Sequence, residues 1–369
     1  MEVSGAMLAL LLFVTIAIPL LYVVITWEHG IVNRYPVLPA PSDLGTKEFR
    51  WRCYLSSWTR RGWKKAILRS PCPRLTLQSR FALLSTDFAK LTTSLGFKEL
   101  KLETIPCIFP QVAVSGLMLQ LLGNSNFPAA LTGLRLKAVT ICQLRPLDMR
   151  FRDEPIAETS NAQEEEQAME GLNCVMVLTE KRILEDEIEF LIQTDIFDDQ
   201  GTVWQSTTCL AVPFYQKTLL VPLSVTAAQL DATLCDKSYD KLETNAFACS
   251  THHLEEFEDV NVTNLDGTAT DKRATPLLWA LGRAMGVLQQ TNRVPTLPLL
   301  CSFVCDDAND VVIPLQSRVE CESSVATMAA GAEERLVTKV ELKHDQRVVV
   351  SGFLRTVGWV FEEGATAEQ

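Results

Sequence analysis

The chain has 369 residues, of which 47% are hydrophobic and 21% are charged, and its formal net charge at pH 7 is -11. This acidic balance excludes the basic footprint of a nucleic-acid-binding protein, and the apolar content excludes a disordered chain. The length suggests two domains or one large one.

The first feature along the chain is an uncharged apolar stretch from Ala6 to Trp27. A helix of this length spans the roughly 30 Å hydrocarbon core of a bilayer. A cleaved signal peptide is the alternative, but the preceding residues contain Glu2 and no Lys or Arg, and no small-residue cleavage site follows. Residues 1–28 are therefore predicted to be an uncleaved transmembrane anchor that contacts the lipid bilayer through residues 6–27.

A basic flank follows this stretch. Between Lys47 and Arg80 the chain carries ten Lys and Arg residues against one acid, Glu48, with tryptophans interleaved. The positive-inside rule places this side in the cytosol or the mitochondrial matrix, so we expect a single-pass protein with its folded part there. The proline-containing segment 29–75 is predicted to be a juxtamembrane linker, which either contacts anionic lipid or is a solvated loop.

The eleven cysteines are odd in number, and no two of them form a Cys-x-x-Cys pair. Several lie within apolar runs, such as Ile141-Cys142 and Leu300-Cys301. Buried cysteine behaves as a small hydrophobic residue, so the pattern predicts reduced thiols in a reducing compartment.

Beyond the linker, the chain repeats one order of elements, an apolar helix followed by strands. In residues 76–215 we expect a buried helix at Val112–Leu122, ended by Gly123-Asn124, before the strands. In residues 216–362 we expect a second buried helix at Ala274–Gln290, and residues 363–369 form a tail. The expected strands of the two units are Leu134–Val139, Cys174–Glu180, Ile188–Phe197, Thr202–Pro213, Leu299–Cys305, Val311–Glu320, Leu336–Lys343 and Arg347–Phe361.

This order predicts an α+β fold in which each of two long buried helices is wrapped by an antiparallel sheet, after one transmembrane helix. Such a duplicated arrangement resembles a double hotdog fold.

The local sequence resembles the MaoC-like acyl dehydratases, the (R)-specific enoyl-CoA hydratase family. The resemblance begins at Ile105-Pro106-Cys107-Ile108-Phe109-Pro110-Gln111 and continues through Phe127-Pro128 and Gly133-Leu134 to Arg145-Pro146-Leu147. Two further stretches, Glu187–Thr208 and Val312-Ile313-Pro314-Leu315, are similar to a hairpin and a late strand of that family.

The resemblance implies an active-site pattern of roughly Tyr-x3-Ser-Gly-Asp-x-Asn-Pro-x-His, in which an Asp/His pair activates water. The corresponding region is Asn261–Gln290, where Asp266 is an acid but no Asn-Pro-x-His follows. No catalytic residue of the family transfers to this chain. The sequence therefore predicts a catalytically degenerate relative of the acyl-CoA hydratases.

Four residues are candidates for a site. Asp266 is either a relocated base or part of a polar turn with Gly267, and Gln120 either orients a thioester or lies at a helix boundary. Trp279 and Arg283 lie one turn apart, so they either line a pocket mouth that meets a CoA phosphate or serve as packing and a surface cation.

A metal site at His252, His253 and Glu256 competes with a solvated, acid-flanked stretch. Adjacent histidines do not share one helix face as an i, i+4 pair does, so no metal and no cofactor are predicted.

The leading hypothesis is a membrane-anchored hotdog protein that binds an acyl chain, acyl-CoA or lipid, or acts as a structural subunit of a membrane complex. No nucleic acid is expected as a partner. The alternative is an active enoyl-thioester hydratase or thioesterase with a displaced active site.

Overall fold

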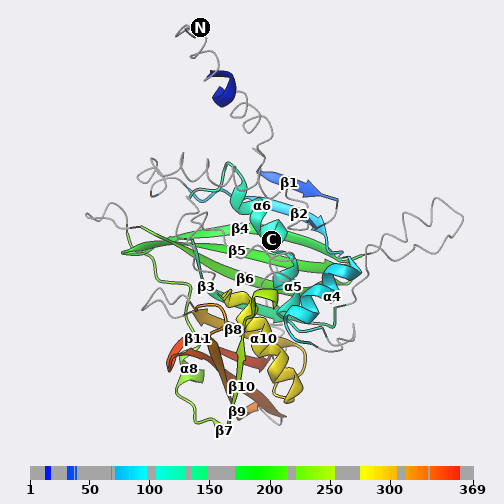
Figure 1. Cartoon of the computed structure of the whole chain (residues 1–369), viewed down its shortest axis with the longest axis vertical. Coiled ribbons are helices and arrows are strands. Elements are labelled where there is room, and N and C mark those ends of the chain that lie inside the picture. The colour runs from blue at the N-terminus through cyan, green and yellow to red at the C-terminus, as the bar shows by residue number, and fades with distance from the viewer. Residues whose placement is uncertain are drawn as a thin grey trace, which may run out of the picture.

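The computed structural model in Figure 1 describes residues 13–17, 31–36, 38–39, 68, 71–82, 84–97, 105–129, 134–147, 171–214, 222–253, 275–305, 313–330 and 333–357. The strands of this part are β1 (Val32–Tyr35), β2 (Thr76–Arg80), β3 (Arg135–Gln143), β4 (Asn173–Ile183), β5 (Glu187–Asp198), β6 (Gly201–Pro213), β7 (Asp240–Ala248), β8 (Leu299–Cys305), β9 (Arg318–Ala330), β10 (Glu333–His344) and β11 (Arg347–Thr356). Its helices include α4 (Ser85–Ser94), α5 (Phe109–Ala113), α6 (Ser115–Gly123), α8 (Ala232–Cys235) and α10 (Leu277–Gln290).

The described strands form one sheet with the order β1-β2-β4-β5-β6-β3-β8-β11-β10-β9-β7. Apart from the edge strand β1, this order is the same five-strand arrangement present twice. The first unit runs β2-β4-β5-β6-β3 and the second runs β7-β9-β10-β11-β8, so each unit places its second strand at the edge opposite its first. The strand order confirms the predicted double hotdog fold.

The two units meet where β3 pairs antiparallel with β8, from Ala138 opposite Val304 to Gln143 opposite Leu299. This pairing continues the sheet from one unit into the other. Figure 1 shows β8 and β11 next to β3, with α10 lying close to α4 and α5.

One face of the sheet carries the apolar core. In β8 the buried and half-buried positions alternate strictly, as a strand with one covered face requires. Buried side chains from α4, α5, α6, α10 and both sets of strands belong to one continuous cluster, which includes Phe109, Phe190, Trp204, Trp279 and Phe303. The two helical layers therefore share a single core.

The first buried helix differs from the prediction of one element at Val112–Leu122. It is divided into α5 and α6 at Val114, whose φ and ψ are -81° and 7°. The helical hydrogen bonds continue across this point, because Val114 donates to the Pro110 carbonyl and accepts from Met118. The prediction of one long helix was thus wrong at a single residue that leaves helical geometry.

Two strand predictions also need correction. Residues Val32–Tyr35, inside the predicted linker, pair in parallel with β2 as edge strand β1. The strand expected at Val311–Glu320 begins at Arg318 and continues to Ala330, where it pairs with both β7 and β10. Neighbouring strands supply its backbone partners, although its serines and alanines are poor strand formers.

The turn expected at His344-Asp345-Gln346 is present between β10 and β11, with φ of 49° at Asp345 and 64° at Gln346. Positive φ at both central residues matches the right-handed twist of a hairpin.

Most of the predicted transmembrane stretch lies outside the described residues. Within the described part of the chain, no helix is long and apolar enough to cross a membrane.

Candidate functional site

The C-terminus of α4, in the first unit, packs against α10 of the second. Gly96 has φ 75°, and the Phe97 and Gly96 amides donate to the Thr92 and Thr93 carbonyls. This is a Schellman motif with glycine in the left-handed position. It satisfies two of the four carbonyls that a helix leaves unpaired at its C-terminal end.

The other two carbonyls are satisfied by α10. Trp279 Nε1 donates to the Ser94 carbonyl at 3.0 Å, and Arg283 Nη1 donates to the Leu95 carbonyl at 2.8 Å. A cation at a helix C-terminus also complements the helix dipole. The one-turn spacing of Trp279 and Arg283 thus matches two successive carbonyls of another helix.

Small residues on α10 allow this close approach. A Cβ at Gly282 would lie 2.5 Å from Leu95 Cδ2, and one at Gly286 would lie 3.0 Å from the Phe97 ring. Burial between the helices lowers the pKa of Arg283, while its guanidinium carbon lies 6.0 Å from the centre of the Phe247 ring. The indole and the guanidinium both take part in the joint between units, and their predicted role in ligand binding stays a prediction.

A cavity of about 270 Å³ lies beside this joint. Its walls come from the segment before α5, the end of β3, the second half of α10 and the segment leading into β8. They consist of Ile105, Pro106, Cys107, Gln143, Pro146, Leu147, Met285, Gln289, Asn292, Val294, Pro295, Leu297 and Leu299. Both units therefore contribute to the cavity.

The described part of the cavity wall carries no charged side chain. Among the described lining residues the polar side chains are Gln143, Gln289 and Asn292, and none is Asp, Glu, His, Lys or Arg. General acid–base catalysis requires a group that exchanges a proton near the operating pH. The lining side chains can hold an apolar chain and orient a carbonyl through amides, but they supply no acid or base.

One lining residue carries a thiol. Cys107 Sγ lies 3.3 Å from Cys301 Sγ, and both residues are buried. Burial, followed by the hydrogen bond with Cys107, raises the pKa of Cys301. Because the thiolate is the reactive species, the raised pKa keeps the Cys301 thiol in its unreactive form.

Of the remaining predicted site residues, those that the structure describes do not line the cavity. Gln120, on α6, is half-buried and is not among the lining residues. Asp266 and Glu256 lie outside the described residues. The rings of His252 and His253 lie 6.5 Å apart, and His253 lies 5.9 Å from Trp279. No group of three potential metal ligands occurs within the described residues.

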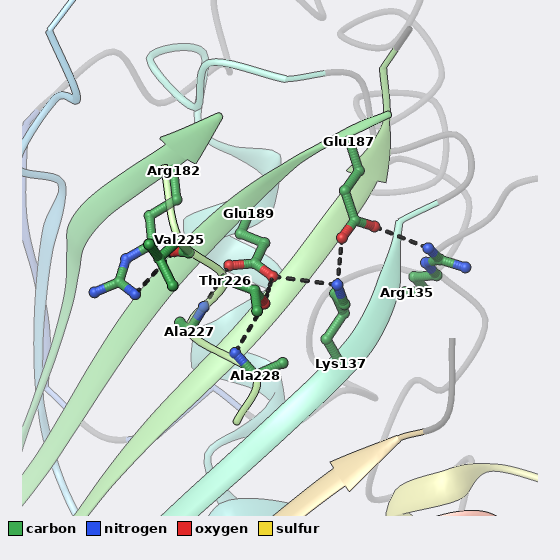
Figure 2. A network of polar contacts seen from close by, with 9 residues as sticks. All are labelled: Arg135, Lys137, Arg182, Glu187, Glu189, Val225, Thr226, Ala227 and Ala228. Atoms are coloured by element: carbon green, nitrogen blue, oxygen red, sulfur yellow. Dashed lines mark hydrogen bonds and ion pairs between the residues drawn. The ribbon is translucent and has the colours of Figure 1, made fainter. Parts of the chain in front are cut away.

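Sequence reasoning missed a buried ionic network on the other face of the sheet. Glu187 and Glu189 alternate along β5 with Ile188 and Phe190, and Phe190 packs against Phe127 on the helical side. By this alternation the two carboxylates lie on the opposite face, and Figure 2 shows both pointing toward Lys137, with Glu187 also facing Arg135. Glu187, Glu189 and Lys137 are all buried.

The network balances two cations with two anions. Lys137 Nζ contacts both carboxylates, at 3.2 Å for Glu189. Arg135 Nη2 binds the second oxygen of Glu187 at 2.8 Å. Ala211 of β6 lies opposite both Glu189 and Arg135, and its small side chain leaves room for these contacts to cross β6.

A segment between the two units covers this network. Thr226 Oγ1 donates to Glu189, and the Ala227 amide donates to the other oxygen of the same carboxylate at 2.8 Å. The Ser224 amide donates to the Ile183 carbonyl at 2.7 Å. The network thus fixes the chain that leads from β6 to β7 on the outer face of the first unit.

The comparisons with known proteins concern the fold. No family model matches the chain, and no curated protein sequence matches it. Among solved structures, HtdX of Mycobacterium tuberculosis is similar with a TM-score of 0.49 and 9% identity, covering 76% of this chain and 100% of that one. A MaoC-like dehydratase from Phytophthora capsici has a TM-score of 0.48 and 13% identity, covering 79% of this chain and 97% of its own.

The full-length peroxisomal multifunctional enzyme type 2 of Drosophila melanogaster is also similar, with a TM-score of 0.48 and 12% identity. The match covers 77% of this chain and 48% of that protein.

Trp279→Phe tests the helix joint. The substitution keeps an aromatic ring but leaves the buried Ser94 carbonyl without its donor, so we expect a loss of about 1–3 kcal/mol in the free energy of unfolding. Chemical denaturation of the full chain would measure it. Unchanged stability together with weakened ligand binding would instead assign Trp279 to the pocket.

Lys137→Met tests the ionic network. Removing the cation leaves two buried carboxylates short of a partner, and we expect a loss of about 3–5 kcal/mol. The matched control is Lys339→Met, which breaks a half-exposed pair with Glu341 (2.7 Å) and costs about 0–1 kcal/mol. Equal losses in the two variants would show that the network contributes nothing beyond a surface pair.

Proposed function

We propose that this chain is a membrane-anchored double-hotdog protein that binds an acyl chain, free or as acyl-CoA or lipid, and does not catalyse its hydration. The observation that carries the proposal is the cavity between the two units, where aliphatic and proline side chains share the described wall with neutral polar groups. Aliphatic side chains and prolines stabilise a hydrocarbon chain by removing it from water, and the amides of Gln143 and Gln289 can orient one polar end.

The size of the cavity limits the ligand. Small-molecule pockets commonly measure about 300–1,000 Å³, so a cavity of about 270 Å³ suits a short chain or one segment of a longer one. The lining residues Val294 and Leu297 are half-buried and exposed, respectively, so the rest of a longer ligand can extend toward solvent beside them.

An anchor places such a site close to its ligands. The uncharged stretch from Ala6 to Trp27 and the basic flank after Lys47 support a single-pass protein with its folded part on the cytosolic or matrix side. In this position the protein could receive lipid from the bilayer or serve as a subunit of a membrane complex.

The competing proposal is an enoyl-thioester hydratase or thioesterase. It needs an acid or base that is absent from the described lining residues, and Asp266 is the candidate in the sequence. Hydration would then require Asp266 to reach a substrate bound at the junction of the units.

Val294→Phe tests acyl binding. The larger side chain fills part of the cavity, so we expect the Kd for decanoyl-CoA to rise by tenfold or more, about 1.4 kcal/mol. Equilibrium dialysis with the full chain in detergent would measure it. The control is Val175→Phe on β4, a half-buried position of the sheet outside the cavity, which should leave the Kd unchanged.

The same preparations would be assayed for hydration of trans-2-enoyl-CoA thioesters of several chain lengths, with an active hydratase alongside. Turnover above background that is lost on Asp266→Ala would replace the binding proposal with an enzyme. Absence of decanoyl-CoA binding and of turnover would contradict both proposals.

Membrane attachment is tested by fractionation. The full chain should remain in the membrane pellet after an alkaline carbonate wash, because an inserted helix is not released by removing electrostatic contacts. Deletion of residues 1–28 should move the protein to the supernatant. Release of the full chain by carbonate would restrict the attachment to the basic flank or to another protein.

A further inference from the structure

The core of the first unit contains a cluster of polar side chains that neither the cavity nor the ionic network uses. It consists of Gln111 on α5, Thr194 on β5, and Ser206 and Thr208 on β6. Their exposed fractions are 5%, 0%, 1% and 3%, respectively. They lie among apolar residues, because Thr194 is on the same face of β5 as Phe190 and Ile192.

The sheet register places these side chains together. Thr194 lies directly opposite Ser206, and Thr208 follows two residues later on the same face of β6. Directly opposed residues have Cβ atoms about 4.5–5.5 Å apart. Gln111 joins the cluster from the helical layer, because its Nε2 donates to Thr208 Oγ1 at 3.0 Å.

Three polar atoms of the cluster have no hydrogen-bond partner within the described part of the chain, namely Gln111 Oε1, Thr194 Oγ1 and Ser206 Oγ. An unsatisfied buried polar group costs about 1–3 kcal/mol, and buried polar atoms nearly always find a protein or water partner. Three such atoms from one helix and two adjacent strands point to a shared ligand.

We propose that one buried water molecule binds at this cluster and joins α5 to β5 and β6. The donor and acceptor inventory fits, because the two hydroxyls can each donate to a water oxygen while the water donates to Gln111 Oε1. A buried water typically makes two to four such bonds. The near-complete burial of all four side chains favours water over a larger ligand.

The proposed site lies beneath one wall of the cavity. Trp204, two residues before Ser206 on the same face of β6, donates from Nε1 to the Cys107 carbonyl at 2.7 Å. Cys107 lines the cavity, and Gln111 lies one turn further along the same segment. The water would therefore help to hold the segment from Ile105 to Gln111 against the sheet.

The sign of a stability change tests the proposal. If the hydroxyls are unsatisfied, the isosteric change Thr194→Val removes a penalty and stability stays the same or rises. If a water is bound, Thr194→Val or Ser206→Ala removes one of its partners, and we expect the Tm of the full chain to fall by about 2–4 °C in each variant. The control is Thr207→Val, at a half-buried position on the opposite face of β6, with a change below about 2 °C.

The double variant tests whether the water is shared. Once the first substitution has released the water, the second substitution has less stabilising interaction left to remove. The combined fall in Tm should therefore be smaller than the sum of the two single falls. An unchanged or raised Tm in either single variant, or strictly additive losses, would overturn the proposal.

A crystal structure supplies the direct measurement. A single water peak within hydrogen-bond distance of Gln111 Oε1 and both hydroxyls supports it, and a direct Thr194–Ser206 contact with no such peak refutes it.

Discussion

The packing of the two units depends on the last four backbone carbonyls at the C-terminal end of α4, each of which needs a hydrogen-bond donor. Two of them are satisfied locally by the turn through Gly96, and the other two accept hydrogen bonds from Trp279 and Arg283 of α10. Because Ser94 is fully buried, its carbonyl has no access to water as an alternative partner. The helical layers of the two units are therefore joined by directional contacts, in addition to the β3–β8 pairing of the sheet.

The two faces of the first unit's sheet hold different kinds of polar chemistry. Full charges are confined to the outer face, where Lys137 lies between Glu187 and Glu189 and the chain around Thr226 excludes solvent. Among the described residues, the buried polar side chains on the helical face of this sheet and those lining the cavity are neutral, such as the amides of Gln111 and Gln143. A neutral interior tolerates an apolar ligand, whereas an unpaired charge there would have to be desolvated. This separation is consistent with the proposed binding of an apolar ligand at the junction.

Local patterns in the sequence predicted the strands and the duplicated order, because strict alternation in segments such as Leu299–Cys305 follows directly from one covered face. They did not predict β1, which within the described residues pairs with β2 alone, or the second half of β9, which depends on β7 and β10. The same limit applies to the sites. Glu187 and Glu189 look like a solvated strand face in sequence, and only the fold brings the Thr226 segment over them.

Trp279 and Arg283 show what residue spacing in the sequence can predict and what it cannot. The sequence placed the two side chains one turn apart on one helix, and this relation holds in the structure. Their partners are carbonyls more than 180 residues away in the chain, which no local pattern indicates. For Arg283 to meet a ligand phosphate through Nη1, that donor would have to leave the Leu95 carbonyl and weaken the end of α4. A ligand that bound there would thereby loosen the joint between the units, so binding at Arg283 and the packing of the two hotdog units would be energetically coupled.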